Sequence, residues 1–191
     1  ANTLLPLGEY TKAEIRELAA SCAFANAHKS DSQDICFIPD GDYARFIEKE
    51  LGEKYPEGDY IDEDGNILGR HKGIIRYTIG QGKGLGLALP HRRYVCDKRI
   101  ESNEVVIGDD EDLFSKELWA SDTVLSAVDK IDSPMRLSAK VRYKHTEQMA
   151  TVTMENGLLH VIFDEPQRAI CKGQSVVLYD GDVLVGGGKI I

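Results

Sequence analysis

The arrangement of apolar and polar positions changes near residue 52. Before it, apolar side chains recur at helical spacing after Thr11 and again over residues 43–51, and Gly52 ends the second run. After it, helical spacing gives way to short β-rich runs separated by turn signals such as Asn156-Gly157. The runs that predict strands are residues 94–96, 104–107, 150–154, 159–163 and 175–179. We therefore predict a mainly β fold with a short α-helical segment at its N-terminal end.

Local signals sharpen these boundaries. Thr11 and Glu14 stand in the order of a capping box, which satisfies backbone donors at the start of the first helix. A polar loop leads to residues 35–38, an apolar run that predicts a short strand stopped by a turn. We place a second boundary near Leu113, after the acidic run of residues 109–112. Short strands at this spacing are typical of small sheets or barrels.

The charge of the chain is acidic overall but unevenly distributed. The 191 residues include 23 Lys and Arg against 32 Asp and Glu, a net charge of −9 that by itself argues against a nucleic-acid binder. Residues 70–99, however, hold eight basic residues and one acid, and residues 135–145 hold four basic residues and no acid. The two basic segments form either a localised anion-binding face or an ordinary fluctuation of charge along the chain.

Composition excludes several classes of protein. No run approaches the ~18 apolar residues of a membrane helix and the first residues do not form a signal peptide, so we expect a cytoplasmic protein without membrane contact. The four cysteines lie far apart without a CxxC pair, and the histidines show no ligand spacing, which predicts reduced thiols and no metal site. The cysteines are Cys22, Cys36, Cys96 and Cys171.

Cys36 is the first candidate for chemistry. It lies between a polar loop and a turn, with apolar residues on either side. A nucleophilic cysteine requires partial exposure and a local positive charge, which Lys29 could supply against the opposing charges of Asp31 and Asp34. The alternative is a buried structural cysteine, which composition alone favours.

A glycine-rich segment, residues 78–87, is the second candidate. Its alternate glycines allow close backbone approach to an anion and Lys83 supplies positive charge, so a phosphate contact is one interpretation. The segment lacks the spacing of a P-loop. A bulged hairpin or a barrel corner is the other interpretation.

Residues 140–145 are the third candidate, because basic side chains alternate there with apolar or aromatic ones. On a strand, Lys140, Arg142 and Lys144 share one face while Tyr143 lies on the other. This pattern suits a nucleic-acid surface with a stacking side chain. A solvated strand face is the simpler explanation of the same pattern.

Longer strings of residues then point to one family. They are PLGEYTKAEIRELA from Pro6, DSQDICFIPDGDY from Asp31, YTIGQGKGLG from Tyr77, KVRYKH from Lys140 and FDEPQRAICKGQSVVLYDGDVLVGGG from Phe163. In this order they resemble the tRNA-specific 2-thiouridylase family over nearly the whole chain. Several long motifs in the same order make the resemblance specific.

The resemblance implies a domain organisation. Members of that family have an N-terminal ATP-pyrophosphatase domain with an SGGVDS phosphate loop, then a small central β domain and a C-terminal β-barrel. Residues 1–52 correspond to the end of the first domain, with the helical segment and the catalytic-cysteine loop. Residues 53–114 correspond to the central β domain and residues 115–191 to a tRNA-binding barrel. ATP is then bound by the N-terminal domain, and no metal is implied for this chain.

The resemblance also implies an activity. The family adenylates the wobble uridine of certain tRNAs at its carbon-2 carbonyl and replaces that oxygen by sulfur, which is relayed from a cysteine desulfurase or a sulfur carrier. Cys36 matches the second catalytic cysteine, which carries the persulfide and then forms a transient disulfide with the first. The expected partners are tRNA and the sulfur-donor relay proteins.

The residues expected to contact tRNA fall into two groups. The resemblance assigns Arg142, Tyr143 and Gln174. The basic segments add Lys140, Lys144 and Lys83. A polyanionic substrate accounts for basic segments in an acidic chain.

The chain also departs from the family pattern. It contains no SGGVDS string and no cysteine in the context of the first catalytic cysteine, and Gly82 stands where the family usually has arginine. We therefore expect part of a longer enzyme, inactive in thiolation by itself. The alternative is a non-enzymatic RNA-binding β-barrel module in which Cys36 is only structural.

Overall fold

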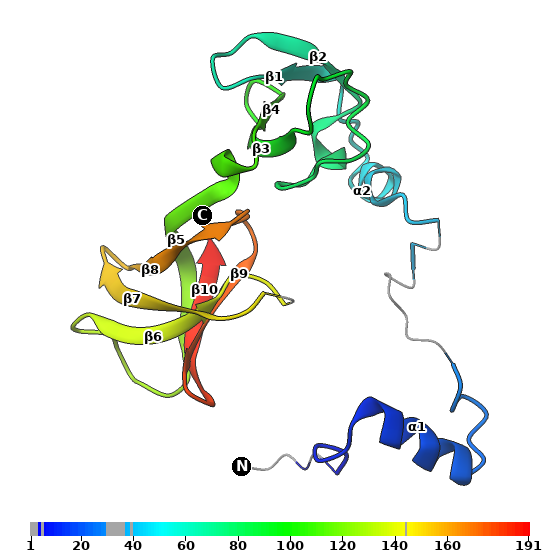
Figure 1. The fold of residues 1–191 in the computed structure, drawn as a ribbon, viewed down its shortest axis with the longest axis vertical. Helices are drawn as coiled ribbons and strands as arrows, with labels where there is room; N and C mark the ends of the chain where they lie inside the picture. Colours follow the sequence, from blue (N-terminus) through cyan, green and yellow to red (C-terminus); the bar gives the residue numbers. More distant parts are fainter. Residues whose placement is uncertain (1–3, 5, 30–36, 39, 144) are drawn as a thin grey trace. The chain divides into compact units, whose positions relative to one another are not determined.

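The computed structural model describes residues 4, 6–29, 37–38, 40–143 and 145–191. The chain divides into two compact units, Ala1–Glu50 and Leu51–Ile191. The described α-helices precede residue 52 and the strands follow residue 57 (Figure 1). Among the described helices, none is long and apolar enough to cross a membrane.

Helix α1 (Lys12–Ser21) begins where the sequence predicts. Oγ1 of Thr11 accepts a hydrogen bond from the backbone N–H of Glu14 at 3.4 Å, and Oε2 of Glu14 accepts one from the backbone N–H of Thr11 at 2.7 Å. The capping box is therefore confirmed. The hydrogen bonds from Thr11 lower the pKa of Glu14, which keeps a negative charge at the helix start.

Helix α2 (Tyr43–Leu51) also has local signals at both ends. Oδ1 of Asp42 accepts a hydrogen bond from the backbone N–H of Arg45 at 2.9 Å, which satisfies a donor of the first turn. Gly52 follows with a φ of +68°, the left-handed conformation that ends many helices. Both ends agree with the predicted helix.

The short strand predicted at residues 35–38 is wrong for the two residues that the structure describes. Phe37 and Ile38 lie in a turn and an irregular segment. The carbonyl of Ile38 accepts a hydrogen bond from the N–H of Gly41 at 3.1 Å, so the chain reverses here instead of pairing. Cys36 lies outside the described residues.

A four-stranded sheet forms within the described residues 58–108, in the order β2-β1-β4-β3. Strands β1 and β4 are parallel and the other pairs are antiparallel. The strands are β1 (Gly58–Ile61), β2 (Ile67–His71), β3 (Tyr94–Arg99) and β4 (Glu104–Gly108), with the 3-10 helix η1 (Ile74–Arg76) after β2. Their buried core consists of Tyr60, Ile74, Tyr77, Val95, Val105 and Ile107.

The glycine-rich segment packs on this core without forming strands of its own. Leu85 and Leu87 lie against the core, and the hydroxyl of Tyr60 donates a hydrogen bond to the carbonyl of Leu85 at 2.9 Å. Gly80 and Gly84 have φ values of +85° and +72°, which only glycine adopts freely. The segment is thus an irregular connection, and the interpretation as a bulged hairpin is wrong.

A closed barrel follows, in the order β10-β5-β8-β7-β6-β9. All of its described neighbours pair antiparallel. The strands are β5 (Phe114–Leu125), β6 (Met135–Lys140), β7 (Gln148–Glu155), β8 (Leu158–Arg168), β9 (Ser175–Asp180) and β10 (Val183–Ile190), preceded by the 3-10 helix η2 (Glu111–Leu113). Alternate residues fill the interior, including Leu159, Val161 and Phe163 of β8.

Glycine on β10 allows two barrel strands to approach closely. A Cβ added at Gly187 would lie 2.2 Å from the carbonyl oxygen of Val176 on β9. Because that oxygen belongs to the backbone, it has little freedom to move aside. Gly187 is therefore required for the β9–β10 pairing.

These elements confirm the predicted fold class: mainly β, with short helices in the N-terminal part, a smaller sheet and a C-terminal β-barrel. The division at residues 1–52, 53–114 and 115–191 stays a prediction.

Candidate functional site

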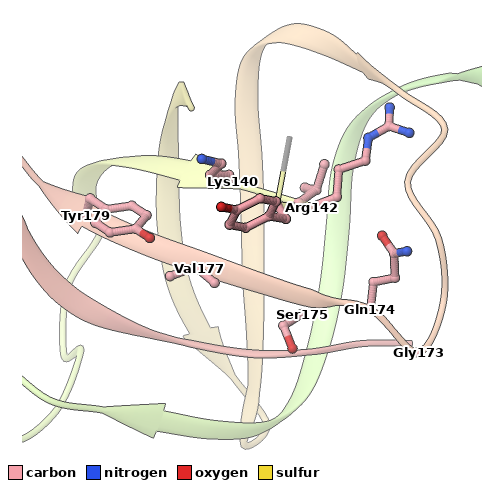
Figure 2. A pocket seen from close by; sticks show the side chains of 9 residues that line it. Lys140, Arg142, Gly173, Gln174, Ser175, Val177 and Tyr179 are labelled. Carbon is pink, nitrogen blue, oxygen red and sulfur yellow. The ribbon is translucent and has the colours of Figure 1, made fainter. Parts of the chain in front are cut away.

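A pocket of about 510 Å³ opens on the barrel where β6 ends and β9 begins. Figure 2 shows Tyr179 and Gln174 toward opposite ends of this pocket, with Lys140 and Arg142 between them along one side. The volume lies within the range of about 300–1,000 Å³ that is common for ligand sites. The lining residues are Lys140, Val141, Arg142, Tyr143, Gly173, Gln174, Ser175, Val177 and Tyr179.

The pairing of β6 with β9 places the polar side chains of the pocket on one face. Lys140 lies opposite Val177, and Ser138 lies opposite Tyr179. Side chains alternate along a strand, so the intervening Ala139 points into the barrel, where it is fully buried. Lys140 and Tyr179 therefore share the outer face of the barrel.

The strand predicted through His145 ends earlier, at Lys140. The backbone N–H of His145 donates to the carbonyl of Arg142 at 3.0 Å, which closes a turn. Val141 is buried, whereas Tyr143 is 91% exposed, so these two residues do not share a face as a strand would require. The predicted alternation is wrong beyond Lys140 because the chain turns there. Lys144 lies outside the described residues.

Arg142 is held by a backbone group. Its Nη2 atom donates a hydrogen bond of 2.8 Å to the carbonyl oxygen of Arg168, at the end of β8. A carbonyl orients the guanidinium without neutralising its charge. No carboxylate among the described residues forms an ion pair with Lys140 or Arg142, so the pocket keeps two unneutralised cations.

Gln174 is positioned by a tight turn before β9. Its N–H donates to the carbonyl of Cys171 at 3.2 Å, and its own carbonyl accepts from the N–H of Ile190 at 2.8 Å. Gly173 has a φ of +85°, which the turn requires. The backbone is thus fixed on both sides of Gln174, which leaves its exposed amide group to meet a ligand.

The cations also act on His145. Burial, and then the charges of Arg142 and Lys140, lower the pKa of His145 below its usual value. Its Nδ1 atom is buried and has no hydrogen-bond partner among the described residues. His145 is therefore neutral near pH 7, and the positive charge of the site comes from Lys140 and Arg142.

Two of the described cysteines, Cys96 and Cys171, are not activated. Burial raises the pKa of Cys96 to about 11, and burial also raises the pKa of Cys171. Cys22 is exposed, and all three thiols are free. A thiolate nucleophile needs a lowered pKa, so Cys96 and Cys171 do not fit that role. The assignment of Cys36 stays a prediction.

The structure brings some of the predicted tRNA-contact residues together and leaves one apart. Lys140, Arg142, Tyr143 and Gln174 line the same pocket. Lys83 is exposed on the glycine-rich segment and does not line it. The described residues contain no group of side chains able to hold a metal ion.

Ser175 and Tyr179 are pocket residues that the sequence did not predict. Tyr179 joins the site only through the pairing of β6 with β9, strands separated by two others in sequence. The run 175–179 predicted a strand, but no local pattern indicated which other strand it would pair with. Together with Lys140 and Arg142, these groups can bind an anionic ligand that also carries planar or hydrogen-bonding groups.

Three family models match the chain one after another. The tRNA methyl transferase HUP domain matches residues 1–40, the tRNA methyl transferase PRC-barrel domain residues 44–109, and the aminomethyltransferase beta-barrel domain residues 115–190. The pocket lies within the third match. The models thus cover both the sheet and the barrel.

Curated relatives identify the family. The tRNA-specific 2-thiouridylase MnmA 2 of Clostridium botulinum is 52% identical over 189 residues, which are 98% of this chain and 54% of the relative. The tRNA-specific 2-thiouridylase MnmA of Clostridioides difficile is 47% identical over 190 residues, 99% of this chain and 53% of the relative. The chain belongs to the tRNA-specific 2-thiouridylase family. It spans about half the length of the curated relatives it matches.

Membership in the 2-thiouridylase family confirms the resemblance found in the sequence. A further relative, the tRNA-specific 2-thiouridylase MnmA of Acetivibrio thermocellus, is 48% identical over 98% of this chain and 52% of its own length. The individual site residues stay predictions.

Proposed function

We propose that the chain is the central and C-terminal part of a tRNA-uridine 2-sulfurtransferase, which makes 2-thiouridine at the wobble position of tRNA. The observation that carries the proposal is the pocket on the family's barrel, where Lys140 and Arg142 have no carboxylate partner among the described residues. The proposed reaction is the one for which the relatives are named. The pocket supplies a surface that suits a polyanion.

The pocket suits RNA through three kinds of contact. Lys140 and Arg142 attract phosphate oxygens, and each phosphate contact releases counterions. Tyr143, almost fully exposed, offers a ring on which an unpaired base can stack. The amide of Gln174 can both donate and accept hydrogen bonds. The barrel therefore acts as the docking surface for tRNA.

Cys36 carries the sulfur in this proposal. Once ATP has adenylated the uridine O2 and released pyrophosphate, the terminal sulfur of the Cys36 persulfide attacks carbon 2 and displaces AMP. A second cysteine thiolate then attacks Sγ of Cys36, which breaks the S–S bond and leaves 2-thiouridine and a disulfide. Two electrons and two protons from a cellular dithiol, or from two thiols, which are oxidised to a disulfide, restore both cysteines. The persulfide itself is loaded by a cysteine desulfurase or sulfur-carrier protein.

The described residues do not fit an ATP site. The HUP match covers only residues 1–40, and the chain contains no SGGVDS loop. The start of α1 is capped by the carboxylate of Glu14, which opposes a bound triphosphate. We therefore assign ATP binding to a part of the enzyme outside this chain and expect the chain alone to be inactive. A tRNA substrate and reduced cysteines accord with a cytoplasmic location.

The test replaces single cysteines in the full-length protein. Cys36→Ser should abolish ATP-dependent formation of 2-thiouridine, measured by mass spectrometry of digested tRNA, while tRNA affinity stays unchanged. Cys22→Ser is the matched control and should keep thiolation. Wild-type thiolation by Cys36→Ser would contradict the catalytic role and favour the alternative, an RNA-binding barrel module with a structural cysteine.

A further inference from the structure

Two guanidinium groups lie over the ring of Tyr94, at the start of β3. The Cζ atoms of Arg92 and Arg168 are each 5.1 Å from the ring centroid. Arg168 also donates hydrogen bonds to Oδ1 of Asp110, from Nε at 3.1 Å and from Nη2 at 2.7 Å. Arg92 forms no ion pair with a carboxylate among the described residues. Tyr94 thus holds one neutralised and one unneutralised cation.

Arg168 connects this cluster to the pocket on the barrel. Its backbone carbonyl accepts the hydrogen bond from Arg142, while its side chain lies over Tyr94. A second basic residue of the sheet, Lys98, acts with Arg142 on the thiol of Cys171, where both charges oppose the effect of burial on its pKa. Basic residues of the sheet and of the barrel therefore lie close to each other around Arg168.

The glycine-rich segment lies against the same cluster. A Cβ added at Gly82 would lie 2.8 Å from two ring carbons of Tyr94 and 3.1 Å from Nε of Arg92. Because residue 82 has no side chain, the segment can lie directly on the ring and the guanidinium. The next residue, Lys83, is exposed and also has no carboxylate partner among the described residues. Lys83 thus directly follows the residue that lies against Arg92.

A basic residue that is already paired with a carboxylate attracts phosphate less than an unpaired one. In the first basic segment, Arg70 pairs with Asp59, Arg93 with Asp109 and Arg99 with Glu104. In the second, Arg136 pairs with Asp164 through two hydrogen bonds. These charges are largely neutralised locally. Lys83, Arg92, Lys140 and Arg142 form no such ion pair among the described residues, and Arg168 is linked to Arg142 through its carbonyl and to Arg92 through the ring of Tyr94.

We propose that Lys83 and Arg92 form a second contact for the phosphodiester backbone of tRNA, continuous with the Lys140–Arg142 pocket. Arg168 is the positioning residue that joins the two contacts: its carbonyl orients Arg142, and its side chain packs on Tyr94, the ring over which Arg92 also lies. This inference rests on the proposed function, because it adds a contact to the same tRNA surface.

The test measures binding of bulk tRNA to the full-length protein over a series of salt concentrations. Each phosphate contact contributes about 0.7–0.9 to the slope of log K against log salt, which corresponds to about fivefold in affinity near 0.1 M salt. Arg92→Ala should lower the affinity about fivefold and reduce the slope by about 1. Arg70→Ala removes the same charge from an ion pair and is the matched control, with affinity and slope close to wild type.

The positioning role of Arg168 has its own readout. In an Arg168→Ala background, Arg92→Ala should have little further effect on affinity, because Arg92 has already lost its fixed position. A purely structural role would lower affinity and melting temperature while leaving the effect of Arg92→Ala intact. A full additional fivefold loss in that background would overturn the positioning role.

The outcomes separate this inference from the proposed function. If wild-type protein does not bind tRNA, the proposed function fails. If Arg142→Ala weakens binding but Arg92→Ala behaves like Arg70→Ala, the second contact is overturned while the proposed function stands. A loss with Arg92→Ala and not with Arg70→Ala supports it.

Discussion

Nη2 of Arg142 donates a hydrogen bond of 2.8 Å to the backbone carbonyl of Arg168, 26 residues further along the chain. The bond orients the guanidinium at the edge of the pocket and leaves its charge unneutralised. Arg142 lies in the turn that follows the end of β6 at Lys140. Replacement of Arg142 should therefore weaken tRNA binding.

Replacing Arg142 with alanine should weaken tRNA binding about fivefold near 0.1 M salt and reduce the salt slope by about 1. Arg142→Lys keeps the charge but not the planar donor group, so it should retain most of the slope. A salt titration of tRNA binding measures both quantities. Arg136→Ala, which removes a paired cation from the same barrel face, is the control. An unchanged slope for Arg142→Ala would exclude this contact.

The cysteines should differ in their rates of alkylation. Burial raises the pKa of Cys96 to about 11 and raises the pKa of Cys171, so little thiolate is present at pH 8. Cys22 is exposed. Of these three, iodoacetamide should modify Cys22 first, and peptide mass spectrometry identifies the labelled site. Labelling of Cys96 or Cys171 in the folded protein as fast as Cys22 would contradict the raised pKa of these two thiols.

Stability should fall as the pH is lowered through the range where His145 titrates. Its folded-state pKa is lowered by burial and by the charges of Arg142 and Lys140, whereas the histidine of the unfolded chain has a pKa of ~6.5. Between the two values the unfolded state binds more protons, so the free energy of unfolding decreases below pH ~6.5. His145→Asn should remove this part of the pH dependence. Urea denaturation at pH 7.5 and 5.5 compares the two proteins, and equal pH dependence in both would contradict the assignment.

Gly187→Ala should destabilise the barrel by about 1–3 kcal/mol, the usual cost of overpacking. The added Cβ would meet the carbonyl oxygen of Val176 at 2.2 Å, so β9 and β10 must separate. Thermal unfolding measures the effect. Val183→Ala on the same strand, where the side chain is 53% exposed, is the control and should change stability by less than about 0.5 kcal/mol. Equal stability of the two variants would show that the strands tolerate a side chain at position 187.

Sequence alone predicted the features that depend on neighbours along the chain. The capping box of Thr11 and Glu14 and the end of α2 at Gly52 are local, since the groups that form them lie within one helical turn. The strand runs were predictable for a similar reason, because alternation and turn residues act over a few positions. These signals were sufficient for the fold class.

The remaining features depend on residues that are distant in sequence. The alternation over residues 140–145 predicted a strand, but the chain turns after Lys140, where Arg142 reaches the carbonyl of Arg168. Tyr179 joins the pocket through the register of β6 with β9, which no local pattern specifies. The charge count likewise could not distinguish Arg92 from Arg70, because ion pairing is a property of the folded chain. Arg142, Tyr143 and Gln174 were predicted through the family resemblance.

The most direct test of the central claim is the amount of 2-thiouridine formed in tRNA by the full-length protein with ATP and a sulfur donor, measured at low and at saturating tRNA. Wild type should form it under both conditions. Arg142→Ala should be slow at low tRNA and recover at saturating tRNA, because in the proposed function the pocket binds tRNA without taking part in sulfur transfer. No 2-thiouridine from the wild-type protein, or full activity of Arg142→Ala at low tRNA, would contradict the account.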